Sequence, residues 1–323
     1  MYSDLPFDQL VRYENPRPVP HDFDEFWQRT LAEHGSAPVD VVAEPYDAEL
    51  DTIEVHDVTF AGYDAHPIRG WLLLPRQRPA PPPVIIEYLG YGGGRGVPIE
   101  SLAYSAAGFA HFIMDTRGQG ATTRAGDTAD PGPTTSAIPG SMTKGITDRE
   151  QYYFRRLYVD AVRAVDAVAA LPDIDASRPV VTGRSQGGAL SLVVAGLRDD
   201  IAVTVPHVPF LATWERALAL SNREPMHEIV RWMKTHRGEV DQALNTLDYF
   251  DAGHFGARAS CPGSFSVALM DGVCPPSTVY AAYNAYRGPK EITVYRYNDH
   301  EGGGPEDQYR TIRQARNVTT SVR

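Results

Sequence analysis

The chain is organised around one stretch, Gly183-Arg184-Ser185-Gln186-Gly187-Gly188. It follows Pro179-Val180-Val181-Thr182, whose β-branched residues are typical of a strand, and it precedes the small and apolar residues of 189–195, which favour a helix. Glycine on both sides of Ser185 allows a turn so tight that the serine must adopt a strained backbone. The turn would hold the serine hydroxyl at a helix N-terminus, where free N–H groups and the helix dipole favour a developing negative charge.

A strand that leads through G-x-S-x-G into a helix is the nucleophile elbow of α/β-hydrolases. The five-residue pattern also arises by chance, and the alternative interpretation is a glycine-rich β–α turn without a catalytic role. The flanking strand and helix favour the catalytic interpretation. Ser185 is therefore predicted to be a nucleophile.

Composition and charge limit the classes of partner. The chain is 42% hydrophobic and 22% charged, as is usual for a globular protein, and its 323 residues suit one large α/β domain, 1–323. A net charge of −11 argues against nucleic acid or an anionic membrane as partner. The N-terminus lacks the basic and apolar regions of a signal peptide, and no apolar run of about 18 residues occurs. We expect a cytoplasmic protein.

The cysteines and histidines indicate neither a disulfide nor a metal site. Cys261 and Cys274 are separated by the expected strand 264–270, which spans roughly 20 Å, whereas a disulfide needs Cα atoms within about 7 Å. We therefore expect free thiols and a reducing compartment. Neither C-x-x-C nor H-E-x-x-H occurs, and the histidines lack metal-ligand spacing, so we predict no metal and no cofactor.

Strands and helices alternate along the chain, which predicts a mainly parallel, doubly wound sheet with helices on both faces. An antiparallel hairpin of residues 52–60 and 67–74 opens this sheet. The other expected strands are 84–88, 109–114, 179–182, 201–205, 264–270 and 291–297, and the expected helices are 148–171, 276–287 and one beginning near Gly304.

Three segments depart from this alternation. Residues 1–45 form an N-terminal extension with an amphipathic helix from Phe23 to Leu31, capped by Asp22, which would pack on the core or, less commonly, bind a partner. Some 25 residues after Gly120 are predicted to form a long loop, a feature that is usually functional or disordered. Residues 211–259 are mainly helical and would either cover an active site or only pack against it.

The glycine-rich loop Gly90-Tyr91-Gly92-Gly93-Gly94-Arg95-Gly96 follows a buried strand, as a dinucleotide-binding loop would. The G-x-G-x-x-G pattern nevertheless fails in every register. In hydrolases the loop after the corresponding strand supplies an oxyanion-hole N–H. That interpretation fits this loop better.

The order Ser, then Asp or Glu, then His identifies partners for Ser185, because each triad member of an α/β-hydrolase follows a strand. Asp271 follows the strand 264–270, and His300 follows the strand 291–297 in a loop whose glycines let the imidazole bend toward the serine. His207 also follows a strand, but that strand comes directly after the elbow, which is too early in the chain for the catalytic base. The remaining competitors are the histidines of the insertion and the acids beside His300: His227, His236, His254, Asp299 and Glu301.

Several motifs together resemble carbohydrate esterase family 7, the acetyl xylan esterases and cephalosporin C deacetylases. The family signature is R-G-Q-G, then G-x-S-Q-G-G, then H-E, and all three occur in order. The matching stretches are Tyr88–Gly96, Asp115–Gly120, Gly183–Gly188, Met270-Asp271 with Cys274–Thr278, and His300–Gly303.

The resemblance implies roles for individual residues. Ser185 would be the nucleophile, His300 the base and Asp271 the residue that orients it, while the backbone N–H groups of Tyr91 and Gln186 would form the oxyanion hole. Arg117 and Gln119 of R-G-Q-G would support the site. The residues implied to line a small acetyl pocket are Tyr91, Phe210, Pro225 and Val273.

The resemblance also implies an assembly and a substrate class. Family members are typically cytoplasmic homohexamers whose active sites face an interior cavity, which favours small diffusible acetyl esters over polymeric xylan. Glu87 and Gly92, beside the oxyanion loop, depart from the Gln and Asn of relatives, which bears on the acyl range.

The predicted function is a metal-independent serine esterase that deacetylates small O-acetylated substrates, such as xylo-oligosaccharides or cephalosporin C-like esters. One alternative is a hydrolase acting on another ester, a lactone or an amide, which activity on amides without activity on acetates would favour. Another is a catalytically idle fold serving as a binding module, which a serine inert to an organophosphate probe would favour.

Overall fold

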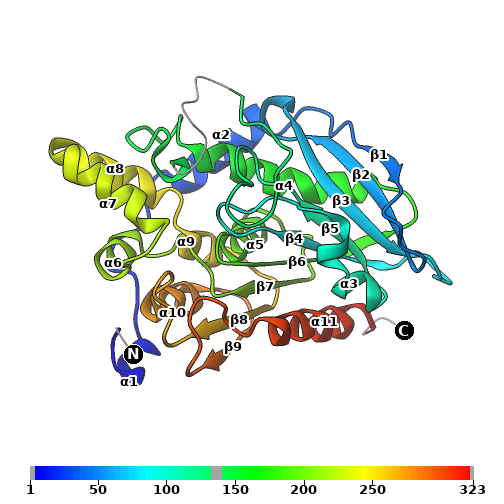
Figure 1. Cartoon of the computed structure of the whole chain (residues 1–323). Helices are drawn as coiled ribbons and strands as arrows, with labels where there is room; N and C mark the ends of the chain where they lie inside the picture. The colour runs from blue at the N-terminus through cyan, green and yellow to red at the C-terminus, as the bar shows by residue number, and fades with distance from the viewer. Residues whose placement is uncertain (1–3, 132–139, 321–323) are drawn as a thin grey trace.

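The computed structural model describes residues 4–131 and 140–320. In these residues the strands form one nine-stranded sheet in the order β1-β2-β3-β5-β4-β6-β7-β8-β9 (Figure 1). Strands β1 to β3 pair antiparallel with their neighbours, and β5, β4 and β6 to β9 run parallel to one another. The strands are β1 Val42–Tyr46, β2 Ile53–Ala61, β3 Pro67–Pro75, β4 Pro83–Tyr88, β5 Ala110–Met114, β6 Asp175–Arg184, β7 Val203–His207, β8 Gly263–Ala268 and β9 Lys290–Tyr295.

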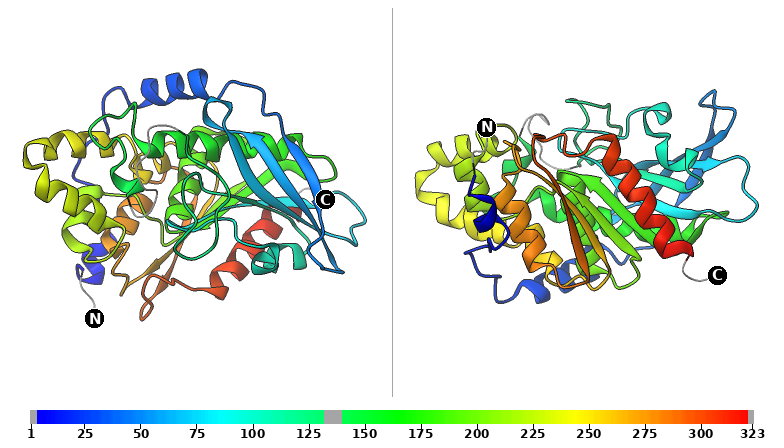
Figure 2. Two further views of the ribbon diagram at one scale, coloured as in Figure 1. Left: turned by 45° about the horizontal axis from the view of Figure 1, so that its top comes forward. Right: turned by 90° about the horizontal axis from the view of Figure 1, so that it is seen from below.

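Helices cover both faces of the sheet. Those described are α1 Phe7–Leu10, α2 Phe23–His34, α3 Ala103–Ala106, α4 Tyr153–Ala170, α5 Gln186–Leu197, α6 Trp214–Leu220, α7 Met226–Thr235, α8 Val240–Asp248, α9 Ala252–Gly256, α10 Pro276–Ala285 and α11 Pro305–Thr320. Figure 2 shows α11 lying across one face of the parallel strands. The predicted α/β architecture with a mainly parallel sheet is confirmed.

The alternation of side chains along β4 explains why both faces need a helical layer. Val84 and Ile86 belong to the large apolar cluster that includes the buried faces of α4 and α5, whereas Ile85 belongs to a smaller cluster with Tyr104 of α3 and Ile312 of α11. Successive residues of a strand point to opposite faces, so an unbroken apolar run is typical of a strand buried on both sides.

Several sequence-based boundaries differ from the structure. Strand β1 and helix α3 were not predicted, and α4 begins at Tyr153 because residues 148–152 form a turn, with the N–H of Tyr152 donating to the carbonyl of Asp148. The strand placed at 201–205 is β7, Val203–His207, which continues through Pro206 and ends on His207. Within the long loop predicted after Gly120, residues 132–139 lie outside the described residues.

The N-terminal helix packs on the core, as one of its two interpretations predicted. Phe26 and Trp27 of α2 are buried in the main apolar cluster, and Trp27 stacks on Tyr158 of α4. Asp22 does occupy the N-cap position, but its carboxylate makes no capping hydrogen bond. It accepts a hydrogen bond from the Tyr249 hydroxyl and pairs with a guanidinium instead.

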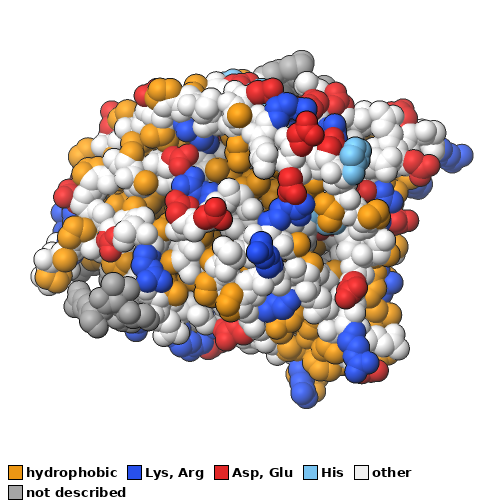
Figure 3. Space-filling model, turned by 180° about the vertical axis from the view of Figure 1, so that it is seen from behind, with side chains coloured by type: hydrophobic (Ala, Val, Ile, Leu, Met, Phe, Trp, Pro, Cys, Tyr) orange, Lys and Arg blue, Asp and Glu red, His pale blue; other side chains and the backbone are white. Residues whose placement is uncertain are grey.

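The helical insertion lies between β7 and β8. Helices α6, α7 and α8 project together at one end of the molecule, while α9 packs against α5, which follows the elbow (Figure 1). Acidic and basic side chains are intermixed on the face seen in Figure 3. None of the helices in the described residues has both the length and the apolar character needed to cross a membrane.

Candidate active site

Ser185 lies at the turn between β6 and α5 with φ +58° and ψ −118°, a strained conformation for a residue with a side chain. Its N–H donates to the carbonyl of His207 at 3.0 Å. A Cβ on Gly187 would come within 2.0 Å of the Tyr88 carbonyl oxygen, and one on Gly183 within 2.5 Å of the same atom. The G-x-S-x-G pattern is therefore a packing requirement: strand β4 approaches the elbow too closely for any other residue.

His300 and Asp271 are hydrogen-bonded to each other. The distance from Nδ1 of His300 to Oδ2 of Asp271 is 2.9 Å, and Oδ1 of Asp271 accepts the N–H groups of Val273 and Cys274, each at 2.8 Å. These three hydrogen bonds fix the position of the buried Asp271 carboxylate. An imidazole that donates through Nδ1 to a fixed carboxylate presents Nε2 as the proton acceptor.

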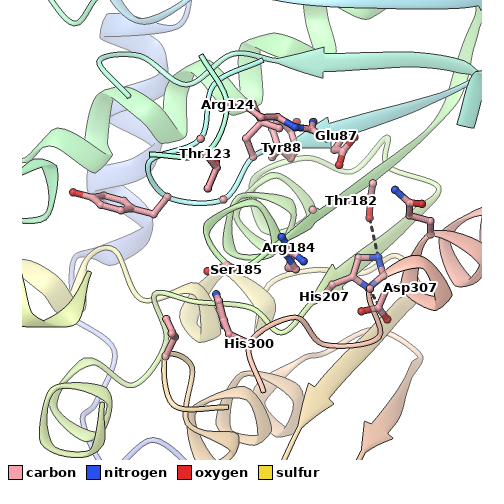
Figure 4. A pocket seen from close by; sticks show the side chains of 18 of the residues that line it. Glu87, Tyr88, Thr123, Arg124, Thr182, Arg184, Ser185, His207, His300 and Asp307 are labelled. Carbon is pink, nitrogen blue, oxygen red and sulfur yellow. Dashed lines mark hydrogen bonds and ion pairs between the residues drawn. The ribbon is translucent and has the colours of Figure 1, made fainter. Parts of the chain in front are cut away.

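Ser185 and His300 line one cavity of about 550 Å³ at the carboxyl ends of the parallel strands. In Figure 4 the His300 imidazole points toward the Ser185 hydroxyl. The structure thus brings together the three residues that the sequence singled out, which follow β6, β8 and β9. The arrangement is suited to nucleophilic acyl transfer, because the imidazole base lies between the serine hydroxyl and the carboxylate that orients it.

The two N–H groups expected to form an oxyanion hole belong to separate segments that one side chain connects. Gln186 is the first residue of α5, so its N–H has no partner within the helix, and Tyr91 lies in the loop after β4. Gln119 accepts the Gly92 N–H at 2.7 Å and donates to the side chain of Gln186 at 3.0 Å. Gln119 therefore fixes the oxyanion loop relative to the helix N-terminus.

Arg117 lies behind the site rather than in it. Its guanidinium is fully buried, donates to both carboxylate oxygens of Asp160 and also pairs with Asp130. Burial lowers the pKa of Arg117, but the two carboxylates outweigh that effect and raise it. Its carbonyl accepts the hydroxyl of Tyr153, which in turn accepts from Gln119. Arg117 thus supports Gln119 without touching the cavity.

Three of the four residues expected to line the acetyl pocket do line the cavity: Tyr91, Pro225 and Val273. Phe210 differs from that expectation. Its side chain is buried against Trp214, and its backbone N–H donates to the carbonyl of Ser185 at 3.0 Å. The turn after β7 directs the Phe210 ring into the core, so Phe210 contacts the elbow through its backbone and does not line the cavity.

Sequence reasoning missed Glu228 of α7. The Tyr91 hydroxyl donates to the Glu228 carboxylate, with both O···O distances 2.9 Å, and the Met142 N–H donates to it at 3.2 Å. Burial raises the pKa of Glu228, and these hydrogen bonds only partly oppose that rise. Glu228 connects the helical insertion to the oxyanion loop. No motif marks it, since it is a single acid beside apolar residues of an amphipathic helix.

The sequence also gave no indication of Asp307, although His207 was considered and set aside as base. Nδ1 of His207 lies 3.3 Å from Oδ1 of Asp307, and Oδ2 of Asp307 accepts the N–H of Gly303 at 2.9 Å. Because the His207 carbonyl also accepts the Ser185 N–H, this pair connects the elbow to the loop that carries His300.

The two departures from the family pattern have local explanations. Glu87 lines the cavity and accepts a hydrogen bond from Nε2 of His111 at 2.8 Å. Burial raises the pKa of Glu87, but His111 and nearby cations outweigh that effect and lower it. Gly92 has φ +76°, and a Cβ there would lie 2.5 Å from the Thr122 hydroxyl, so Thr122 in this chain favours glycine at position 92.

One group in the described residues has ligand atoms close enough to hold a metal: Asp271, Cys274 and His300, within 4.8 Å of one another. Burial raises the pKa of the Cys274 thiol well above its usual value. Because a thiol must ionise to bind a metal, this environment disfavours the site as a metal centre. Both Cys261 and Cys274 are free, as predicted.

Comparison with known proteins agrees with this geometry. The acetyl xylan esterase (AXE1) family profile matches residues 1–317. The structure of an acetyl xylan esterase from Paenibacillus sp. R4 is 35% identical, with a TM-score of 0.88, over 97% of this chain and 100% of that one. Acetyl xylan esterase 1 from Thermoanaerobacterium sp. JW/SL YS485 is 31% identical, with a TM-score of 0.85, over 96% of this chain and 99% of that one.

A relative among characterised sequences is acetyl esterase Axe7A of Xylanibacter ruminicola, 31% identical over 287 residues and 87% of this chain. The chain spans 63% of the length of that relative. The profile match and the two full-length structural matches each cover nearly all of the described fold, including the elbow and the His300 loop. The chain belongs to the acetyl xylan esterase family.

Proposed function

We propose that this protein is a serine esterase that removes acetyl groups from small O-acetylated sugars. The observation that carries the proposal is the elbow serine, Ser185, in one cavity with the hydrogen-bonded pair of His300 and Asp271. Membership of the acetyl xylan esterase family supports the choice of an acetyl ester as substrate.

The proposed reaction has two halves. In the first, the Ser185 Oγ attacks the acetyl carbonyl carbon while Nε2 of His300 takes the hydroxyl proton, and the N–H groups of Tyr91 and Gln186 hold the oxyanion. The C–O bond to the sugar then breaks, and His300 gives its proton to the departing alkoxide. In the second half His300 takes a proton from water, hydroxide attacks the acetyl-enzyme, and acetate leaves as Ser185 regains its proton.

The fixed environment of Asp271 explains how His300 can take up a proton during these steps. Its carboxylate accepts two backbone N–H groups as well as the imidazole N–H, so it cannot rotate away when His300 becomes charged. A buried, oriented carboxylate stabilises the imidazolium without taking the proton. The acid therefore acts through position and charge.

The acyl end of the cavity supports a preference for short acyl groups. Tyr91, Pro225 and Val273 line the cavity near Ser185, and the Tyr91 ring is held in place by its hydrogen bond to Glu228. Side chains held in this way would limit the length of acyl chain that fits beside Ser185. Cephalosporin C-like acetates, which are also small, fall within the same proposed range.

Assembly and location form part of the proposal by resemblance to the family. We expect a cytoplasmic homohexamer that admits small diffusible esters and excludes polymeric xylan. Size-exclusion chromatography with light scattering would measure the assembly, and fractionation of the native host would establish the location. A monomer in solution would contradict the hexamer without affecting the catalytic assignment.

A series of p-nitrophenyl esters, from acetate to octanoate, tests the function. We expect a steep preference for acetate and a loss of several orders of magnitude in kcat/KM in Ser185→Ala. A rate that peaks at longer chains would contradict the acyl assignment, and hydrolysis of amides but not acetates would indicate a different bond. A folded protein inactive on every ester would contradict the esterase proposal itself.

A further inference from the structure

The cavity is much larger than an acetyl group requires. At about 550 Å³ it lies within the range that encloses a whole drug-sized ligand. Figure 4 shows Ser185 and His300 on one side and a group of polar residues on the other. We call this second part the polar compartment; it is lined by Glu87, Arg124, Thr182, His207, Asp307 and Gln308.

The charged groups of the polar compartment are already paired with protein groups. Glu87 accepts from His111 at 2.8 Å, and Asp307 pairs with His207 at 3.3 Å and with Arg310 at 3.0 Å. Arg124 donates to the Ser101 hydroxyl and to the Glu100 carbonyl, at 3.0 and 2.9 Å. These groups therefore offer a ligand hydrogen bonds rather than an unpaired charge. The guanidinium of Arg184 also lines the cavity and pairs with no carboxylate among the described residues, so it can donate to a ligand oxygen.

These groups nevertheless keep unused hydrogen-bonding capacity. A carboxylate offers about four lone-pair sites, and the Glu87 side chain accepts one hydrogen bond, from His111, within the part of the chain that the structure describes. Gln308 lies in the first turn of α11, and within the same described residues its amide pairs with no other group, so it offers both a donor and an acceptor to the cavity. Such a lining suits a neutral ligand with several hydroxyl groups.

The two groups of lining residues belong to different elements. Pro225 precedes α7, and the Tyr91 hydroxyl donates to Glu228 of that helix. Gln308 lies on α11, well apart from α7 in Figure 1. The end with Tyr91, Pro225 and Val273 offers mainly bulky side chains, whereas the polar compartment offers hydrogen-bonding groups. An ester bound with its carbonyl carbon at Ser185 must direct its acyl part to one side and its alcohol part to the other.

We propose that the polar compartment binds the alcohol half of the substrate, a neutral polyhydroxylated sugar, with Gln308 and Glu87 hydrogen-bonding its free hydroxyls. The inference rests on the proposed esterase function. It adds that recognition of the sugar comes from the first turn of α11 and the end of β4, which are not part of the triad. The low pKa of Glu87 keeps its carboxylate ionised as an acceptor at neutral pH.

The test compares two acetyl esters in the same enzyme. Mono-O-acetylated xylobiose carries free hydroxyls on its alcohol half, whereas p-nitrophenyl acetate carries none. For Gln308→Ala we expect KM for the sugar ester to rise about fivefold, the contribution of one hydrogen bond, with kcat/KM for p-nitrophenyl acetate changed less than about twofold. Gln314→Ala, the same substitution on α11 at a residue that does not line the cavity, is the matched control.

A second measurement reads binding of the alcohol half alone. Unmodified xylobiose should inhibit hydrolysis of p-nitrophenyl acetate competitively, and its inhibition constant should rise in Gln308→Ala and in Glu87→Ala but not in Gln314→Ala. Equal changes with both esters, or no change with either, would overturn the inference. Failure of the proposed function would look different, since the folded wild-type protein would then hydrolyse neither ester.

Discussion

Gln119 offers the sharpest test of how the site is held together. Replacing it with alanine leaves the Gly92 N–H without its acceptor and removes the donor to Gln186 and Tyr153. Each buried polar group left unpaired costs about 1–3 kcal/mol, so we expect the free energy of unfolding to fall by about 2–4 kcal/mol.

The effect on catalysis should exceed the effect on binding. Losing one oxyanion donor outright costs about 10²–10³ in kcat; here the Tyr91 N–H is misplaced rather than removed, so we expect kcat to fall about 10–100-fold. KM should change little, because the oxyanion exists only in the transition state. Steady-state kinetics on p-nitrophenyl acetate, together with urea unfolding followed by tryptophan fluorescence, would measure both quantities.

Tyr153→Phe is the matched control. The Tyr153 hydroxyl bonds the same Gln119 amide and the Arg117 carbonyl but makes no contact with the Gly92 N–H. This variant should lose stability with kcat within about twofold of the wild type. A Gln119→Ala enzyme that is equally destabilised but keeps its full kcat would refute a positioning role for Gln119.

Three further substitutions test other contacts. Burial raises the pKa of Glu228, so the contribution of this group to the free energy of unfolding is complete below its ordinary pKa and is lost as pH rises through the higher folded-state value. The Tm of Glu228→Gln should therefore fall less than the Tm of the wild type between about pH 5 and pH 8, and an equal fall would contradict this reasoning. Gly92→Ala places a Cβ 2.5 Å from the Thr122 hydroxyl at φ +76° and should cost about 1–2 kcal/mol of stability with a lower kcat, measured by urea unfolding and kinetics. Asp307→Asn breaks a buried pair and should lower stability by about 3 kcal/mol and reduce kcat; an unchanged kcat would show that Asp307 does not position His300.

The parts of the site that could be predicted are those that depend on local chemistry and chain order. The elbow is encoded within six residues, because the turn itself demands glycine at Gly183 and Gly187. Asp271 and His300 could be identified because parallel strands bring their carboxyl ends to one edge, and chain order restricts the candidates.

The remaining residues depend on contacts between distant segments. Tyr91 and Glu228 are 137 residues apart, and only the packing of α7 against the oxyanion loop shows that they meet. Phe210 was placed in the acetyl pocket, whereas the turn after β7 directs its ring toward Trp214. Strand β8 ends at Ala268, so a short turn separates Asp271 from the strand it was expected to follow directly.

The connection through His207 and Asp307 has a consequence for heat inactivation. The nucleophile and the loop that carries the base are both fastened to Asp307, in the first turn of α11, so loosening that helix would separate them. The enzyme should therefore stop working at a temperature below that at which the sheet melts, because a local opening suffices. Variants with a longer half-life are best sought at Ile312 and Ala315, which hold α11 in the smaller apolar cluster but do not line the cavity.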